Sequence, residues 1–340
     1  MTKSLNKNNY YPLIDVFKFI CALLVVMIHC LEIPYGHPIA TAIVKLFSSQ
    51  AVPFFFIVSG FFIGNKLVSS NWDLSVVRKP LKSWLYLYLA WTVIWSYYNI
   101  NMYVSKYPDA SMLFILVLLF RRIVMAGQGV YWYLLILIES VALLAVFIKF
   151  KKEKIFYCVA IVGILLSFAY DMNFTLYGFG QINLIFYKLF SWSNNVIMKG
   201  IPYVAIGYFI SNNKNVFSKV KFKPVLLLYL LVNIIMICIY GKNENLLYVF
   251  YPVQAVCLFL IAFLKQDIAI NTKVNKVCRN MSMALYYVHT VILYWIIDPL
   301  LGKDTAILFK FIIVFVITFS LYWITMKKHL KLFKDLLGIK

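Results

Sequence analysis

The chain has 340 residues, of which 63% are hydrophobic and 13% are charged, whereas a soluble domain is roughly half apolar and roughly a quarter charged. Several apolar runs reach the ~18 residues that a helix needs to cross a bilayer, which excludes a soluble globular fold. The net charge of +21 does not indicate a nucleic-acid partner, because the basic residues lie in short tracts between apolar runs. The six cysteines lack the spacing of a metal or redox site.

We predict an all-α integral membrane protein with a single domain over residues 1–340 and a short basic tail from about residue 326. Apolar runs and their breakers divide the chain into ten spans, at about 12–32, 47–64, 83–99, 130–148, 155–170, 196–211, 224–240, 246–264, 281–298 and 306–325. Lys and Arg gather in every second connecting segment, which places both termini in the cytoplasm. The abundance of Lys, Asn, Ile, Phe and Tyr is typical of AT-rich bacterial genomes, so we expect a bacterial cytoplasmic membrane.

One more apolar run, at residues 111–120, is short and ends at Arg121 and Arg122. Counting it as a span would move the basic tract at 149–154 to the outer side, against the charge pattern. We therefore predict that residues 100–128 form an outer loop with an interfacial or re-entrant helix.

The first span carries a stripe of polar residues. Lys18 and His29 are eleven positions apart, so they share one helix face and are separated by ~16 Å along the axis. Asp15 and Glu32 extend the same stripe at either end. Polar groups that face lipid are costly, so the stripe should face the interior of a bundle and form a site there. The alternative is structural: an Asp15–Lys18 ion pair and a hydrogen-bonded core histidine.

Further motifs follow along the chain. They are VPFFFIVSGFF at 52–62, which contains Ser59; Arg78-Lys79-Pro80-Leu81-Lys82; GVYWYL at 129–134, which contains Trp132; and Ser282, Tyr286 and His289, whose spacing puts them on one helix face. Together with Lys18 and His29, this set resembles the membrane-bound acyltransferase 3 family over the whole chain. In that family Arg is more usual than Lys at the positions of Lys18 and Lys82. The chain also resembles the membrane domain of vancomycin-resistance serine racemases.

The resemblance implies transfer of an acyl group, commonly acetyl from acetyl-CoA, to a hydroxyl of a cell-surface polysaccharide or related glycan. Acyl-CoA would be the donor substrate, and no permanently bound cofactor or metal is expected. Arg78, Lys79 and Lys82 lie at the predicted inner face, where they can hold the phosphates of CoA. Ordinary anchoring by positive charge at the inner face is the alternative.

His29 is the candidate general base, because a neutral imidazole can take the proton of a sugar hydroxyl as that hydroxyl attacks the thioester. Its action as a nucleophile, through an acyl-imidazole, is the alternative. Lys18 is expected to receive the pantetheine arm or the thioester oxygen, and Asp15 lies beside it. Glu32 either orients the imidazole or faces water at the interface.

Other side chains in the spans are candidates for contact with substrate. A donor to the thioester oxygen is needed, and Ser59, Tyr286 or His289 can supply it. Glu139 is an isolated carboxylate in mid-span, which is either structural, paired with Lys18 or a tyrosine hydroxyl, or part of the acceptor path. The remaining candidates are Trp132 and Ser282.

Two other functions stay open. Intramembrane charges also suit a carrier for a small polar solute such as an amino acid, although no inverted repeat is visible. A non-catalytic subunit of an envelope assembly would use the stripe only for packing. An enzyme should lose acyl transfer when His29 is replaced, whereas a carrier would move solute without consuming acyl-CoA.

Overall fold

The structure is a computed structural model that describes residues 11–31, 38–126, 129–171, 194–242, 246–302 and 305–339, and within these ranges its regular elements are all helical. The α-helices are α1 Pro12–Cys30, α2 Pro38–Ser48, α3 Ala51–Ser69, α4 Ser75–Lys106, α5 Met112–Arg121, α6 Trp132–Lys149, α7 Glu153–Asp171, α9 Ile201–Asn212, α10 Lys214–Phe217, α11 Phe222–Ile239, α12 Leu247–Leu264, α13 Thr272–Val291, α14 Asp298–Leu301, α15 Ile307–Lys327 and α16 Lys331–Leu336. Shorter π-helical or 3-10 turns are η1 Arg122–Ala126, η2 Gly129–Tyr131, η4 Val196–Gly200 and η6 Ile292–Ile297.

Eight helical segments of the described ranges are long and apolar enough to cross a membrane, which confirms an all-α polytopic membrane protein. The other two predicted spans, 83–99 and 196–211, also fall in helices. The first lies inside the 32-residue α4, and its many Trp, Tyr and Ser residues lower the mean hydropathy of this stretch. The second is made of η4 and α9 in succession.

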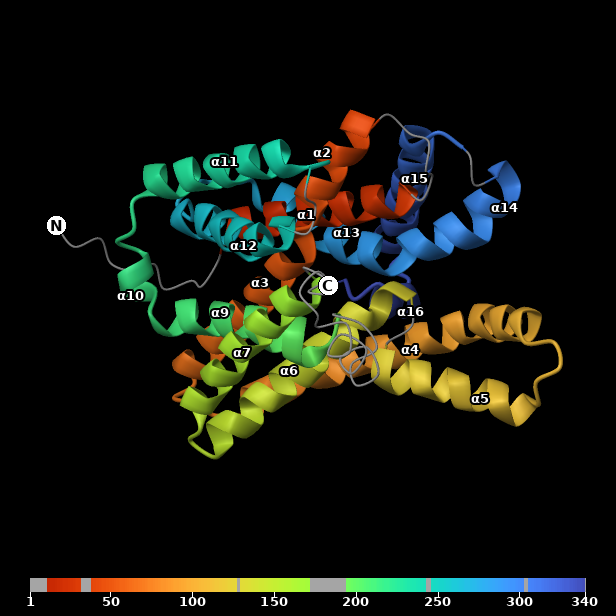
Figure 1. Cartoon of the computed structure of the whole chain (residues 1–340), viewed down its shortest axis with the longest axis horizontal. Helices are drawn as coiled ribbons and strands as arrows, with labels where there is room; N and C mark the ends of the chain where they lie inside the picture. The colour runs from red at the N-terminus through yellow and green to blue at the C-terminus, as the bar shows by residue number, and fades with distance from the viewer. Residues whose placement is uncertain are drawn as a thin grey trace.

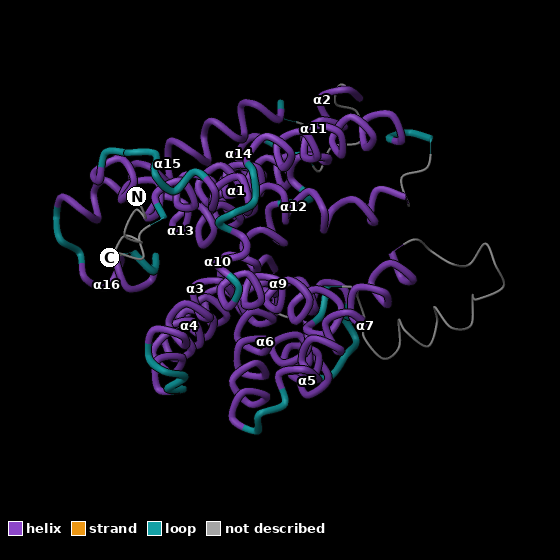
Figure 2. The backbone as a smooth tube through the Cα atoms, turned by 90° about the vertical axis from the view of Figure 1, so that its left-hand side faces the viewer, coloured by secondary structure: helices purple, strands orange, loops and turns teal. Residues whose placement is uncertain are grey.

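The helices form two layers, which can be followed in Figure 1 and from the side in Figure 2. One layer contains α1, α2 and α11 to α15, and the other contains α3 to α7 and α9. Contacts of α3 with α1 and α12 join the layers.

Helices α3 and α9 pack closely because each presents a glycine to the backbone of the other. A Cβ on Gly60 would collide with the carbonyl oxygen of Val204, and one on Gly207 would collide with that of Ile57. Glycine is therefore required at both positions by the close approach, as in other membrane helix pairs. The tight contact joins α3 to α9 within the second layer.

The span predicted at 281–298 starts too late. Helix α13 begins at Thr272, where the side chain of Asn271 accepts a hydrogen bond from the backbone N–H of Lys273 at 2.9 Å. Its first turns are polar, so the apolar run does not reveal them. They are nevertheless helical because they pack on α1, where buried Asn275 contacts Asp15. The helix thus begins more than two turns before the apolar run.

The loop predicted at 100–128 is mostly helical. Helix α4 continues to Lys106, and α5 runs back beside it after a short turn (Figure 1). The Ser111 hydroxyl caps α5 by accepting from the backbone N–H of Phe114 at 3.3 Å.

At the other end of α4, Asp73 accepts from the hydroxyl of Ser75 and from its backbone N–H, the latter at 2.8 Å. These hydrogen bonds lower the pKa of the Asp73 carboxyl.

Candidate functional site

The starts of α1 and α13 meet in a polar contact. The Lys18 ammonium lies 3.0 Å from Oδ1 of Asp15, and the amide of Asn275 donates to Oδ2 of the same carboxylate at 3.2 Å. Asp15 is only 7% exposed, so its charge is balanced inside the bundle and not presented to lipid. The ion pair expected under the structural interpretation of the stripe is therefore present. Lys18, however, also faces a cavity.

This cavity, which we call the inner chamber, has a volume of about 220 Å³ and lies at the seam of the two layers. Its walls come from α1, α3, α4, α6 and α13 and are mainly apolar and aromatic. Besides the tyrosines, the polar residues in the walls are Lys18, Ser59, Lys66 and Ser282. The hydroxyl of Ser59 donates to the carbonyl of Phe55 at 2.8 Å, so the Ser59 oxygen is the acceptor in its hydrogen bond with the Tyr133 hydroxyl.

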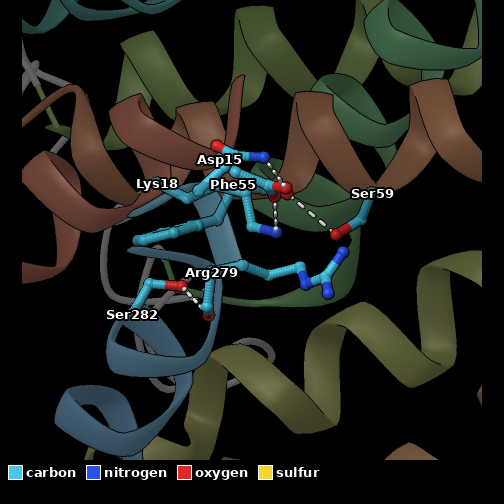
Figure 3. A network of polar contacts seen from close by, with 7 residues as sticks. Asp15, Lys18, Phe55, Ser59, Arg279 and Ser282 are labelled. Atoms are coloured by element: carbon cyan, nitrogen blue, oxygen red, sulfur yellow. Dashed lines mark hydrogen bonds and ion pairs between the residues drawn. The ribbon is translucent and has the colours of Figure 1, made fainter. Parts of the chain in front are cut away.

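Arg279 of α13 lines neither chamber but lies close to the inner one, and it is not among the residues predicted from the sequence. Figure 3 shows its guanidinium pointing toward the space that the Lys18 ammonium and the Ser59 hydroxyl also face. The hydroxyl of Ser282, one turn along α13, donates to the backbone carbonyl of Arg279 at 2.7 Å. The spacing of Arg279, Ser282 and Tyr286 places all three on one helix face, and this pattern could have identified Arg279 from the sequence.

Arg78, Lys79 and Lys82 lie in the first turns of α4 and are exposed. None of the three lines the inner chamber, but Pro80 and Trp84 of the same turns do. The basic cluster therefore borders the chamber from the solvent side. A ligand with a charged head and a narrow apolar arm would fit this arrangement, with the head outside and the arm within.

A larger cavity of about 520 Å³, the outer chamber, lies further along α1. His29 lines it together with Trp132 of α6 and Lys199 of η4. Lys199 donates to the hydroxyl of Ser167 at 2.8 Å. Three further tyrosines in its walls, from α9 and α12, are Tyr203, Tyr248 and Tyr251. The chamber thus combines a titratable imidazole, an ammonium group and several aromatic faces.

The two chambers share a wall. Phe55, Tyr133 and Tyr286 line both of them. The Tyr133 ring centroid lies 6.0 Å from that of Phe55 and 5.7 Å from that of Tyr286. The Tyr286 hydroxyl donates to the carbonyl of Val130 at 3.2 Å, which fixes its ring. We call these three side chains the aromatic wall.

His289 lies behind His29, away from both chambers. It is 1% exposed, and the centroids of the two imidazole rings are 5.3 Å apart with a tilt of 44°. Nδ1 of His289 lies 2.6 Å from the carbonyl oxygen of Leu285, one turn earlier in α13. A carbonyl oxygen can only accept, so Nδ1 carries the proton and Nε2 carries a lone pair.

The structure therefore brings some predicted residues together and separates others. Lys18, Ser59 and Ser282 line the inner chamber, His29 and Trp132 line the outer one, and Tyr286 lines both. Glu139 is half-buried on α6 and lines neither chamber. Glu32 lies outside the residues that the structure describes. Tyr133, Lys199 and Arg279 are the additions to the predicted set.

Comparison with known proteins gives one match. The family model described as an acyltransferase domain matches residues 11–327, which include every described residue of both chambers. No curated protein and no solved structure matches the chain.

Proposed function

The chain belongs to the acyltransferase domain family, and from this we propose that it moves an acyl group, acetyl in the first place, from acyl-CoA to a hydroxyl of a cell-surface glycan. The observation that carries the proposal is the pair of chambers with one common wall. One chamber is bordered by cations and the other holds His29. A donor and an acceptor that enter from opposite sides can then meet at the aromatic wall.

The donor side is supported by charge and shape. Acyl-CoA carries phosphates on a long, narrow pantetheine arm, and guanidinium and ammonium groups bind phosphate strongly. Arg78, Lys79 and Lys82 would hold the phosphates in water, with Arg279 at the edge of the chamber. Lys18 lies deeper and would contact the amides of the arm. The thioester would then reach the aromatic wall.

The acceptor side is supported by the outer chamber. Aromatic faces of Trp132, Tyr203 and Tyr251 offer apolar surfaces on which a sugar ring can stack, and polar groups among them fix its orientation. The volume of about 520 Å³ is within the range of small-ligand sites. We place one or two sugar units of an envelope glycan here, at the outer side of the bacterial cytoplasmic membrane.

The chemistry rests on His29. The acceptor oxygen attacks the thioester carbonyl carbon while His29 takes the hydroxyl proton, and the carbon–sulfur bond then breaks. The departing CoA thiolate takes the proton from the imidazolium, so His29 returns to its neutral form. The negative charge on the carbonyl oxygen needs a donor at the wall, and we assign this role to the Tyr133 hydroxyl, which would turn its proton from Ser59 to the developing oxyanion.

The test is release of CoA thiol by purified protein in nanodiscs that receive acetyl-CoA with or without an envelope-glycan extract. We expect glycan-dependent release and acetyl transfer by the wild type and loss of both in His29→Ala. His329→Ala is the matched control, because His329 is an exposed residue after α15. Equal release by the His29→Ala and wild-type proteins would contradict the proposal. So would movement of a small solute without consumption of acyl-CoA.

A further inference from the structure

We propose that His289 is a positioning residue that sets the orientation and tautomer of the His29 imidazole. The inference rests on the proposed function and deepens it. In other acyl-transfer enzymes a carboxylate often orients the basic imidazole. Here the orienting group would be a second, neutral imidazole that is supplied by α13.

The first support is the register of α1 and α13. Near their starts, Asp15 of α1 contacts Asn275 of α13. Fourteen residues further along each helix, His29 meets His289 at a ring distance of 5.3 Å. The two helices therefore run parallel and in the same register. The packing that brings Asp15 to Asn275 also brings His29 to His289. The Asp15–Asn275 contact fixes the height at which the rings meet.

The second support is the hydrogen bonding of His289. Its Nδ1–H donates to the Leu285 carbonyl at 2.6 Å, which leaves a lone pair on Nε2. Nε2 is buried and has no hydrogen-bond partner among the described residues. A buried acceptor without a partner is costly, so a donor is expected to approach it. The imidazole of His29 is the titratable group that lies against this ring.

The geometry lets His29 be that donor. With ring centroids 5.3 Å apart, a rotation of the half-buried His29 ring brings one of its nitrogens to roughly 3 Å from Nε2, the distance of an N–H hydrogen bond. His29 would then carry its proton on the nitrogen that faces His289. Its other nitrogen would carry the lone pair and face the outer chamber, which His29 lines and His289 does not.

This arrangement has a mechanistic consequence. The nitrogen that faces the acceptor is always the base, because the other tautomer would oppose the lone pair of Nε2 with a second lone pair. When His29 accepts the proton of the acceptor hydroxyl, it keeps the hydrogen bond to His289 and gains a stabilised imidazolium. The same proton then goes to the CoA thiolate, so His289 gains and loses no proton in the cycle.

The experiment compares His289→Leu with His289→Gln in the CoA-release assay. Leucine removes the acceptor, whereas the glutamine amide oxygen can occupy the place of Nε2. We expect His289→Leu to lower kcat about 10- to 100-fold, part of the contribution of a positioned base, with the KM for acetyl-CoA changed less than about threefold. His289→Gln should recover most of the loss. Both proteins should keep the wild-type yield and thermal midpoint.

Three other outcomes would contradict the role of His289 or the proposed function. Full activity of His289→Leu beside an inactive His29→Ala would overturn the role of His289 and leave the proposed function intact. Equal losses in the Leu and Gln variants, with a fall in thermal midpoint, would show a packing role only. A wild-type protein without glycan-dependent release, while His329→Ala behaves identically, would overturn the proposed function and this inference with it.

Discussion

The ring of Tyr133 lies 6.0 Å from the ring of Phe55, and both side chains face the inner and the outer chamber at once. Tyr133 comes from the first turn of α6 and Phe55 from α3, so the barrier between the chambers is built within one layer and closed by Tyr286 from the other. In the proposed mechanism, an acyl group that enters on CoA must reach the acceptor through this wall. The wall should also keep water of the outer chamber away from the thioester.

Phe55→Ala should therefore uncouple donor consumption from transfer. Removal of the ring joins the two chambers and admits water to the thioester, so release of CoA in the absence of glycan should rise several-fold. Phe62→Ala is the matched control, because Phe62 lines the inner chamber only. It should leave the glycan-independent rate unchanged. Equal leakage in the two variants would mean that the aromatic wall does not control the access of water.

Tyr133→Phe should lower kcat by about 100-fold with little change in the KM for acetyl-CoA, because loss of one donor to a developing oxyanion costs about 10²–10³ in rate. The measurement is steady-state kinetics at saturating glycan. Tyr131→Phe is the control, since that hydroxyl is buried and donates to the backbone carbonyl of Tyr287 at 2.6 Å. Tyr131→Phe should lower the thermal midpoint and leave kcat near the wild-type value. A fully active Tyr133→Phe would remove Tyr133 from the mechanism.

The sequence predicts the fold well because its dominant signal, apolar run length, is physically what a bilayer selects. It predicts the ends of the helices less well. The polar turn before Asn275 and the polar end of α4 are helical because they pack against other helices. The length of an apolar run carries no information about that packing. The charge pattern likewise leaves 111–120 out of the set of spans, and the ten-residue α5 is not among the helices long enough to cross a membrane. The pattern does not predict that α5 folds back on α4.

For the site, the sequence predicts which side chains share a face but not which faces meet. Lys18 and His29 could be placed on one stripe of α1, and Ser282, Tyr286 and His289 on one stripe of α13. That the two stripes face each other, in step along both helices, depends on tertiary packing. For the same reason the sequence does not predict Tyr133 and Arg279 as site residues. Each looks ordinary in sequence, as an interfacial aromatic and as one inner cation among many.

Arg279 offers the sharpest test of how the donor is held. Arg279→Gln removes a half-buried cation whose guanidinium points toward the space beside Lys18 (Figure 3). A charge-assisted hydrogen bond to phosphate contributes about 1.5–3 kcal/mol, so the KM for acetyl-CoA should rise roughly tenfold or more. The maximal rate at saturating donor should change little, because the guanidinium would bind the donor before and during the reaction alike.

Lys276→Gln is the matched control for Arg279→Gln. Lys276 carries the same charge on the same helix, three residues earlier, but it is exposed, whereas Arg279 is half-buried. If the donor is held by general attraction to a basic inner surface, both variants should weaken binding to a similar, small extent, and added salt should abolish the difference from wild type. If Arg279 binds the donor directly, only Arg279→Gln should raise the KM, and its effect should persist at high ionic strength because the partly buried contact is screened less.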